Sequence, residues 1–516
     1  MTDSRTKNST RNIIFSLVAY FIQIVLGFFV RRYFIFYFGE EYLGLNSVFA
    51  NVLSFLSLAE LGFGTAIVFS MYKPMADGDE EKVRQLLQFY KKSYFMIAII
   101  VVVLGLLVLP FMNYFKAQAP NVNANFYVVY LIFLFNSVVS YFFAHRRSLL
   151  YTSQRNDLES KINILLNIVL TGLQLVACFA KNYYIYILLS GIFAIIGNLL
   201  VFLITQRKYK KYLEKPQGYL DKETRKTINK NVYSMVFHKI GSIIVYSTDS
   251  LVIFMILGAV SLGKYSNYLL VTTYLSTIIG IFTGALRGSI GNSIASESVE
   301  KNVALLKKLN FIYFAIISFA TIAIYVMVDP FIDVVLTHDA SASLVLDKTV
   351  LLLICINFFL SQSRYMMGMF KECAGLYYQD RYKSLFEAGI NLIVSIVLAY
   401  YIGLSGVIIG TIVSNIATSL WVEPYVLNKH YLKESTAKYF GKYLLYTLAM
   451  LVSAVVTVFV CNFIVATDFW TLVLKGVVCC AMAGVMLLIT MSPHKEFKET
   501  LSWGKEIITN LKNSRK

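Results

Sequence analysis

Residues 93–112 read SYFMIAIIVVVLGLLVLPFM and contain no charged side chain. A run of about 20 apolar residues can cross the hydrocarbon core of a membrane as one helix, because the helix satisfies its own backbone hydrogen bonds where lipid cannot. Comparable apolar runs recur along the whole chain and are separated by short, basic loops. This pattern predicts an all-α integral membrane protein.

The composition of the chain agrees with that prediction. Of its 516 residues, 57% are hydrophobic and 15% are charged, whereas a typical soluble chain carries about 25% charged residues. The formal net charge is +18, but the excess cations lie between apolar runs, so we attribute them to membrane topology and expect no binding of nucleic acid. The six cysteines show no metal-type spacing, so we predict no metal site and no disulfide framework.

About fourteen transmembrane helices are expected, and an even number places both termini on one side. The loops on that side hold 38 of the 47 Lys and Arg residues, and the opposite loops hold 4. By the positive-inside rule, both termini are predicted to be cytoplasmic. The expected spans are 12–38, 45–71, 93–112, 126–144, 162–180, 184–205, 231–257, 266–287, 309–329, 348–370, 384–402, 404–426, 443–465 and 470–490.

An internal repeat is indicated by paired glycines. Gly39 and Gly44 recur 219 residues later as Gly258 and Gly263. Six spans per repeat would give the two halves the same orientation, as in transporters whose site lies between related halves. We therefore expect two pseudo-symmetric six-helix bundles plus two extra helices. The predicted parts are an N-terminal bundle (1–205), a basic cytoplasmic linker (206–230), a C-terminal bundle (231–428), and two additional helices with a basic cytoplasmic tail (429–516).

Two stretches carry a resemblance to a known family. Residues 38–79 read FGEEYLGLNSVFANVLSFLSLAELGFGTAIVFSMYKPMADGD, and residues 386–415 read FEAGINLIVSIVLAYYIGLSGVIIGTIVSN. Both resemble bacterial flippases of polysaccharide repeat units (O-antigen, capsule or exopolysaccharide). These flippases form the polysaccharide transporter branch of the multidrug/oligosaccharidyl-lipid/polysaccharide exporter superfamily. The resemblance in span number, layout and basic central loop covers nearly the whole chain.

The resemblance implies a function. Such proteins flip undecaprenyl-diphosphate-linked oligosaccharides across the inner membrane by alternating access, for the synthesis of surface polysaccharide. It implies no cofactor, and it implies coupling to an H⁺ or Na⁺ gradient or to the membrane potential. The expected partners are the lipid-linked oligosaccharide, membrane lipids and other membrane proteins of polysaccharide assembly.

Several basic residues lie within the expected spans or at their ends, where an ionisable group is costly unless it faces water, a partner or a substrate. A lipid diphosphate cannot cross bare hydrocarbon, so we predict a cationic path between the two bundles. Arginine suits this role because its fork offers two donors to phosphate oxygens. The alternative role for each residue is an ordinary helix-end anchor. The candidates are Arg31, Arg32, Lys239, Arg287 and Arg364.

Three further ionisable groups are candidates for ion coupling or charge pairing: Glu60, His238 and Asp249. Asp249 corresponds to Val30 in the other half of the repeat, next to Arg31. We therefore expect Asp249 to be a resting partner that a substrate phosphate displaces. The alternative is that Asp249 is a structural hydrogen-bond anchor.

Glu60 lies in the segment AELGFG (59–64), where the two glycines suggest close helix packing or a kink. A proton- or ion-coupling role and a buried hydrogen bond to a neighbouring helix are both open for it. In contrast, Glu423, which is followed by a proline near the end of a span, is expected at the membrane interface.

The sequence leaves two alternative functions. An ion-coupled drug or small-molecule antiporter of the same superfamily would favour acidic cavity residues when its substrates are cations. A membrane polysaccharide polymerase or ligase would favour catalytic side chains on a long loop, for which loop 330–347 offers Asp333, His338 and Asp339. The chain has no G-x-x-x-x-G-K-[ST] motif and no evident nucleophile–base–acid set, so we predict a transporter that is not an enzyme.

Overall fold

The computed structural model describes residues 2–60, 62–153, 155–337 and 343–513. Within these ranges, the side chains of several helical stretches, including 2–16, 233–242 and 505–513, lie outside the description. The chain divides into two compact units, Met1–Ser266 and Asn267–Lys516. All the regular structure described in both units is helical. The predicted boundaries of the bundles at 205, 231 and 428 stay predictions.

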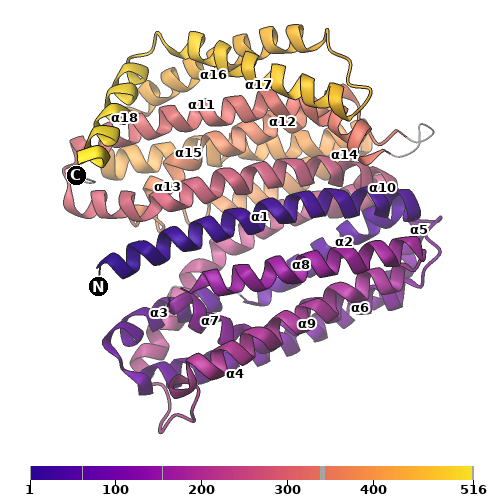
Figure 1. The fold of residues 1–516 in the computed structure, drawn as a ribbon, viewed down its shortest axis with the longest axis vertical. Helices are drawn as coiled ribbons and strands as arrows, with labels where there is room; N and C mark the ends of the chain where they lie inside the picture. Colours follow the sequence, from indigo (N-terminus) through magenta and orange to yellow (C-terminus); the bar gives the residue numbers. More distant parts are fainter. Residues whose placement is uncertain (1, 61, 154, 338–342, 514–516) are drawn as a thin grey trace. The chain divides into compact units, whose positions relative to one another are not determined.

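The first unit begins with a long helix that packs along a later one, α1 beside α8, while α8 packs on α9 and α9 on α6 (Figure 1). Its elements are α1 (Thr2–Phe38), α2 (Glu40–Leu56), η1 (Ser57–Glu60), α3 (Phe63–Asp77), α4 (Glu80–Leu106), η2 (Leu109–Phe111), α5 (Met112–Ala117), α6 (Phe126–Val139), η3 (Ser140–Phe143), α7 (Ala144–Thr152), α8 (Asn156–Phe179), α9 (Tyr183–Lys208), η4 (Lys210–Tyr212) and the first part of α10 (Lys222–Ser296).

The second unit is organised around α11, which packs against α12, α16 and α17. Its elements after the end of α10 are α11 (Val299–Phe331), η5 (Ile332–Leu336), α12 (Lys348–Ser363), α13 (Tyr365–Cys373), α14 (Lys383–Ala417), α15 (Ser419–Leu427), η6 (Asn428–Leu432), α16 (Thr436–Cys461), α17 (Phe469–Met491) and α18 (Lys495–Asn513).

Eleven helical segments in the described ranges are long and apolar enough to cross a membrane. Three of the fourteen expected spans are absent as separate segments, for identifiable reasons. The span 45–71 is divided at η1, because Gly62 adopts a left-handed φ of 78°. The other two continue from a neighbouring helix across a sharp bend, at Gly258 (φ 83°) in α10 and at Gly403 (φ 60°) in α14. Glycine permits these positive φ values without steric cost, so no loop interrupts the helix.

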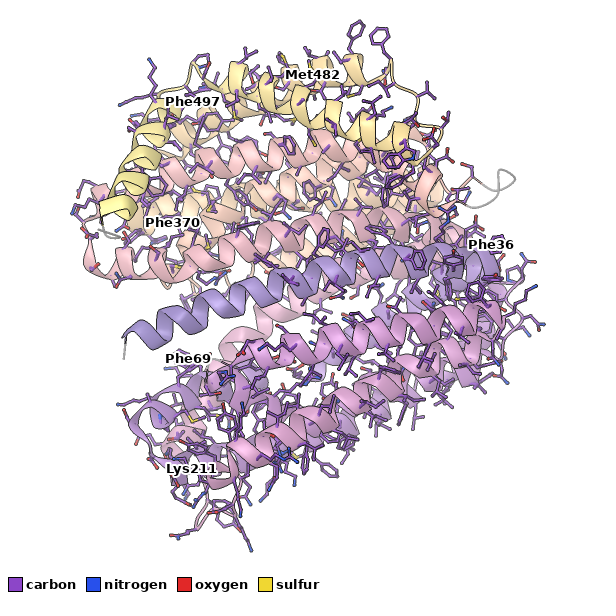
Figure 2. All side chains as sticks on the ribbon, in the orientation of Figure 1. Phe36, Phe69, Lys211, Phe370, Met482 and Phe497 are labelled. Atoms are coloured by element: carbon purple, nitrogen blue, oxygen red, sulfur yellow. The ribbon has the colours of Figure 1, made fainter. Side chains whose placement is uncertain are left out.

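Large apolar side chains on the outside of the helices agree with a membrane environment. Phe69 is 71% exposed and projects from α3, whereas Phe370 on α13 is fully buried (Figure 2). Many other exposed residues are Phe, Leu, Val or Ile on the long helices. A soluble monomer rarely exposes so much contiguous apolar surface, but in lipid this surface needs no protein partner.

The repeat predicted from the glycines has a geometric counterpart in the first unit. Gly39 (φ 87°, ψ 179°) and Gly258 (φ 83°, ψ 174°) share one unusual backbone conformation. Five residues after each, a glycine contacts the other copy: a Cβ at Gly44 would collide with the carbonyl oxygen of Ala259, and a Cβ at Gly263 would collide with that of Glu40. Since Glu40 and Ala259 are also 219 residues apart, the two contacts are equivalent by the same offset. We call this arrangement the glycine crossing.

The predicted basic linker folds back onto the start of α4. Arg84 donates to the Lys211 carbonyl oxygen at 2.6 Å and pairs with Glu214 at 2.7 Å. Lys82 contacts Asp221, and Lys211 pairs with Glu80 at 2.6 Å. These pairs hold the linker against the first unit.

Candidate functional site: charged groups within the helices

Arg364 lies where α12 meets α13, and two carboxylates hold its guanidinium. Its Nη1 donates to Glu423 Oε1 at 2.9 Å, and its Nη2 lies 3.8 Å from Glu387 Oε1. Ser419 donates to the other oxygen of Glu387 at 2.6 Å. Both glutamates are buried inside the second unit, and the interfacial depth expected for Glu423 stays a prediction. The neighbouring Pro424 lies inside α15, and α15 packs on α13 and α14, which carries Glu423 into the unit.

Two lysines extend this group into a chain of alternating charges. Lys383 contacts Glu423 and lies 3.8 Å from Asp380, and Lys371 contacts Asp380. Lys371 and Asp380 are buried, and the side chain of Lys383 is 7% exposed. We name as the corner cluster the following residues: Arg364, Lys371, Asp380, Lys383, Glu387 and Glu423.

The corner cluster balances three cations with three carboxylates at the junction of α12, α13, α14 and α15. A buried charge without a partner is strongly destabilising, so the pairing itself is what makes the burial tolerable. Gly368 makes room for the corner cluster, since Glu423 Oε2 lies 3.1 Å from where a Cβ of this glycine would be. Three members of the cluster, Lys371, Asp380 and Lys383, fall in an expected cytoplasmic loop, so the sequence analysis does not place them in a site.

Arg287 forms a second ion pair in the same unit, and this one is exposed. Its Nη1 donates to Glu372 Oε2 at 2.7 Å, and both side chains are more than one third exposed. Arg287 and Arg364 therefore lie in different environments, one facing solvent or headgroups and the other enclosed by carboxylates.

Arg31 in the first unit reaches α10. Its Nη2 donates to Ser266 Oγ at 2.5 Å, and the serine hydroxyl donates in turn to the carbonyl oxygen of Gly263, at 2.7 Å. Arg31 is thus joined through one side chain to the glycine crossing. Arg32 beside it is also half-buried.

Asp249 lies on α10 and is half-buried. It lies within electrostatic range of Tyr265, the residue before the serine that Arg31 contacts. Arg31 and Asp249 thus interact with the neighbouring residues Ser266 and Tyr265 of α10, respectively. His238 and Lys239 also fall within α10, but their side chains lie outside the described residues.

Glu60 lies in η1, at the break between α2 and α3, and meets tyrosines of α4. Tyr94 donates to Glu60 Oε1, and the rings of Tyr90 and Tyr94 stack with centroids 4.5 Å apart. Gly64 leaves room for this contact, because a Cβ there would collide with the Tyr94 hydroxyl. No cation lies within 4 Å of the Glu60 carboxylate among the residues that the structure describes.

The described residues contain no cluster of three or more His, Cys, Asp or Glu side chains arranged to hold a metal ion. Of the loop residues considered for catalysis, Asp333 is exposed in η5, and His338 and Asp339 lie outside the described residues.

The sequence matches the family model described as "Polysaccharide biosynthesis protein" over residues 9–286. The match covers more than half of the chain, and the protein therefore belongs to this family. A comparison with curated proteins gives no match.

Several solved transporters share the fold. The lipid II flippase MurJ in an inward closed conformation gives a TM-score of 0.65 at 15% identity, over 93% of this chain and 99% of its own. An inward-facing multidrug resistance MATE family transporter of the MOP superfamily gives 0.58 at 16%, over 81% and 99%. The MATE transporter VcmN of Vibrio cholerae gives 0.59 at 14%, over 84% and 99%. At these identities the likeness shows that the chain has the fold of MOP-superfamily transporters.

Proposed function

We propose that this protein flips undecaprenyl-diphosphate-linked oligosaccharide repeat units across the bacterial inner membrane, for the synthesis of surface polysaccharide. The observation that carries the proposal is the family match over residues 9–286, joined to a fold shared with a lipid II flippase. The partners are the lipid-linked oligosaccharide, the surrounding lipids and other membrane proteins of polysaccharide assembly. Both termini are cytoplasmic, and the cycle includes no catalytic step.

Charge inside the helices supports an anionic substrate. Arg31 donates its hydrogen bond to a neutral serine hydroxyl on α10, and a phosphate oxygen is a stronger acceptor for a guanidinium than a hydroxyl is. A diphosphate that reaches this side chain would replace the serine and accept hydrogen bonds from the guanidinium fork. Arg31 is therefore our first candidate for substrate contact, with Arg32, Lys239, Arg287 and Arg364 as further members of the cationic path.

Glu60 is our candidate for ion coupling. Among the described residues, the Glu60 carboxylate accepts a hydrogen bond from a tyrosine hydroxyl and not from a cation, so it can accept a proton without leaving a buried cation unpaired. The carboxylates of the corner cluster differ, because protonating them would strand lysines or an arginine. Glu60 also lies at a helix break, where a change of protonation can alter the bend between α2 and α3.

Depletion of the protein in a strain that makes the polysaccharide tests the proposal. Lipid-linked repeat units should accumulate in the inner leaflet, and surface polysaccharide should fall. Wild-type protein should restore export. An Arg31→Ala variant at normal protein level should not, while Arg31→Lys should restore part of it, because Lys keeps the charge but loses the two-donor grip. Normal export on depletion, together with a loss of resistance to cationic drugs, would contradict the flippase and favour the antiporter.

A further inference from the structure

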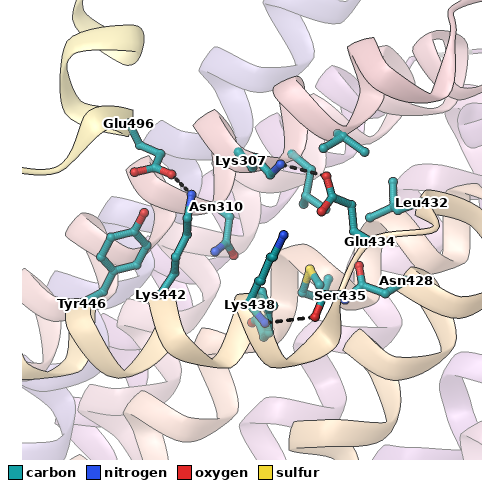
Figure 3. Close-up of a pocket in the computed structure, with 14 residues that line it drawn as sticks. Lys307, Asn310, Asn428, Leu432, Glu434, Ser435, Lys438, Lys442, Tyr446 and Glu496 are labelled. Carbon is teal, nitrogen blue, oxygen red and sulfur yellow. Dashed lines mark hydrogen bonds and ion pairs between the residues drawn. The ribbon is translucent and has the colours of Figure 1, made fainter.

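A cavity of about 340 Å³ lies in the second unit, at one end of its helices (Figure 3). The first turns of α11 and α16 form two walls, and η6 and the start of α18 close it. Its volume is in the range of small-molecule sites. It is separate from the corner cluster, none of whose members lines it.

Two Lys–Glu ion pairs and one further lysine line the cavity. Lys307 pairs with Glu434 at 3.0 Å, and Lys442 contacts Glu496. The Lys438 side chain points into the same space (Figure 3), and no carboxylate lies within 4 Å of its Nζ among the described residues. The lining therefore carries three cations against two carboxylates, and the excess charge belongs to Lys438.

Both lining carboxylates are stabilised in their charged form. The hydrogen bond from Lys307 lowers the pKa of Glu434. Burial alone would raise the pKa of Glu496, yet the hydrogen bond from Lys442 lowers it overall. The two glutamates thus stay ionised at neutral pH and neutralise the two lysines that they contact, so the net positive charge of the cavity persists.

Asn310 supplies a second, independent feature. Its side chain lines the cavity from α11 and is 9% exposed, and its Oδ1 has no hydrogen-bond partner among the described residues. A buried amide oxygen left without a partner is destabilising, and a turn of this amide group toward the cavity would let a ligand complete its hydrogen bonds. The amide offers one acceptor and two donors, which suits a molecule that carries both hydroxyl and phosphate groups.

The position and the remaining walls indicate a lipid. Leu306, Met367 and Leu432 give the cavity an apolar side. The cavity lies where α11 and α16 begin and η6 ends, that is, at the ends of three candidate spans. Helix ends lie at the level of lipid headgroups, and basic residues on the face predicted to be cytoplasmic attract anionic lipid.

We propose that this cavity binds the glycerol-phosphate headgroup of an anionic membrane phospholipid. Lys438 pairs with the phosphate, the Asn310 amide binds the headgroup hydroxyls, and the apolar side receives the start of an acyl chain. This site is independent of the proposed flippase substrate and of the residues assigned to its path.

Native mass spectrometry of the full chain with added phosphatidylglycerol tests this inference. Lys438→Gln should weaken binding by about tenfold, the effect of losing one charge-assisted hydrogen bond. Asn310→Leu should also weaken it, and its thermal unfolding would be measured alongside because the site is buried. Lys498→Gln is the matched control: it removes one exposed cation from α18 outside the cavity and should leave binding unchanged.

Four results would overturn the proposal. Equal binding by Lys438→Gln and wild type would exclude the cavity, and an equal loss in Lys498→Gln would reduce the effect to general surface charge. Full displacement of the lipid by soluble glycerol phosphate at the same concentration would indicate a site for free phosphate esters. Binding of undecaprenyl phosphate that depends on Lys438 more strongly than that of phosphatidylglycerol would assign the cavity to the substrate carrier.

Discussion

Each half of the predicted repeat contains a buried aspartate with basic partners, and these partners differ in their exposure to solvent. In each, a buried aspartate precedes or begins a long helix and pairs with nearby cations: Asp157 at the start of α8 is 1% exposed, and Asp380 just before α14 is 0% exposed. The partners of Asp157 are Arg155 and Lys161, which are 30% and 48% exposed. The partners of Asp380 are Lys371 and Lys383, which are 4% and 7% exposed.

This difference means that, if the aspartate is neutralised, water can hydrate its cationic partners in the first unit but not in the second. Removing one partner of a buried ion pair costs about 3–5 kcal/mol when the charge left behind stays buried, and the cost is smaller where the remaining cations reach water, as they do in the first unit. The same sequence element, an acidic residue near the start of a helix with basic neighbours, therefore carries different energetic weight in the two halves.

The largest expected effect is that of Asp380→Asn. The change leaves Lys371 buried next to a neutral amide, while Lys383 keeps Glu423 as its partner, so the free energy of unfolding should fall by about 3–5 kcal/mol. Thermal unfolding in detergent, followed by the loss of the monodisperse peak, measures it. A loss below about 1 kcal/mol would mean that water reaches the corner cluster.

The glycine crossing provides a symmetric reference for the comparison. Gly44→Ala and Gly263→Ala each place a methyl group against a backbone carbonyl, which should cost about 1–3 kcal/mol. Because the contacts are equivalent, the two losses should agree. Gly172→Ala on α8 is the control, since nothing lies within 4 Å of its Cβ position, and it should be neutral or stabilising. Unequal losses would show that the repeat is not energetically symmetric here.

Asp157→Asn should have a smaller effect than Asp380→Asn, of about 1 kcal/mol, because Arg155 and Lys161 can be hydrated once the carboxylate is gone. The same thermal unfolding assay compares the two variants directly. Equal destabilisation by both variants would show that the exposure of the cationic partners does not set the cost of losing the aspartate.

The smallest effect on stability is expected for Arg287→Gln. Its pair with Glu372 is exposed on both sides, so the free energy of unfolding should change by less than about 0.5 kcal/mol. Export measured on the same variant tests its predicted place in the cationic path. A fall in export at unchanged stability would support that place, and normal export would remove Arg287 from the path.

Much of the fold could be predicted from the sequence, because the cost of an unpaired backbone group in lipid forces apolar runs such as 93–112 into helices. The glycine pairs also marked positions with a definite structural role: Gly39 and Gly258 take the same positive φ. The number of separate spans was harder to predict than their helical character. Whether Gly403 ends one helix or only bends it depends on local geometry that composition does not specify.

The ion-pair partners of the charged groups could not be predicted from the sequence. Hydropathy places Arg364 along a helix, but it does not say which carboxylate lies opposite, because that is set by the packing of α12 against α14 and of α13 against α15. For the same reason the expected spans leave Lys383 in a loop, although its side chain is buried against Glu423. A signal was present in the two acidic residues of the apolar segment 383–427, Glu387 and Glu423, which require buried partners.

The most direct test of the central claim is flipping by the purified protein in liposomes. Undecaprenyl-diphosphate-linked oligosaccharide would be placed in both leaflets, and an impermeant glycosidase added outside. Without protein, about half of the sugar should be cleaved, because only the outer leaflet is accessible. With wild-type protein cleavage should approach completion, and with Arg31→Ala it should remain near the protein-free level. If wild-type protein under an imposed H⁺ or Na⁺ gradient gives no more cleavage than empty liposomes, the flippase account is contradicted.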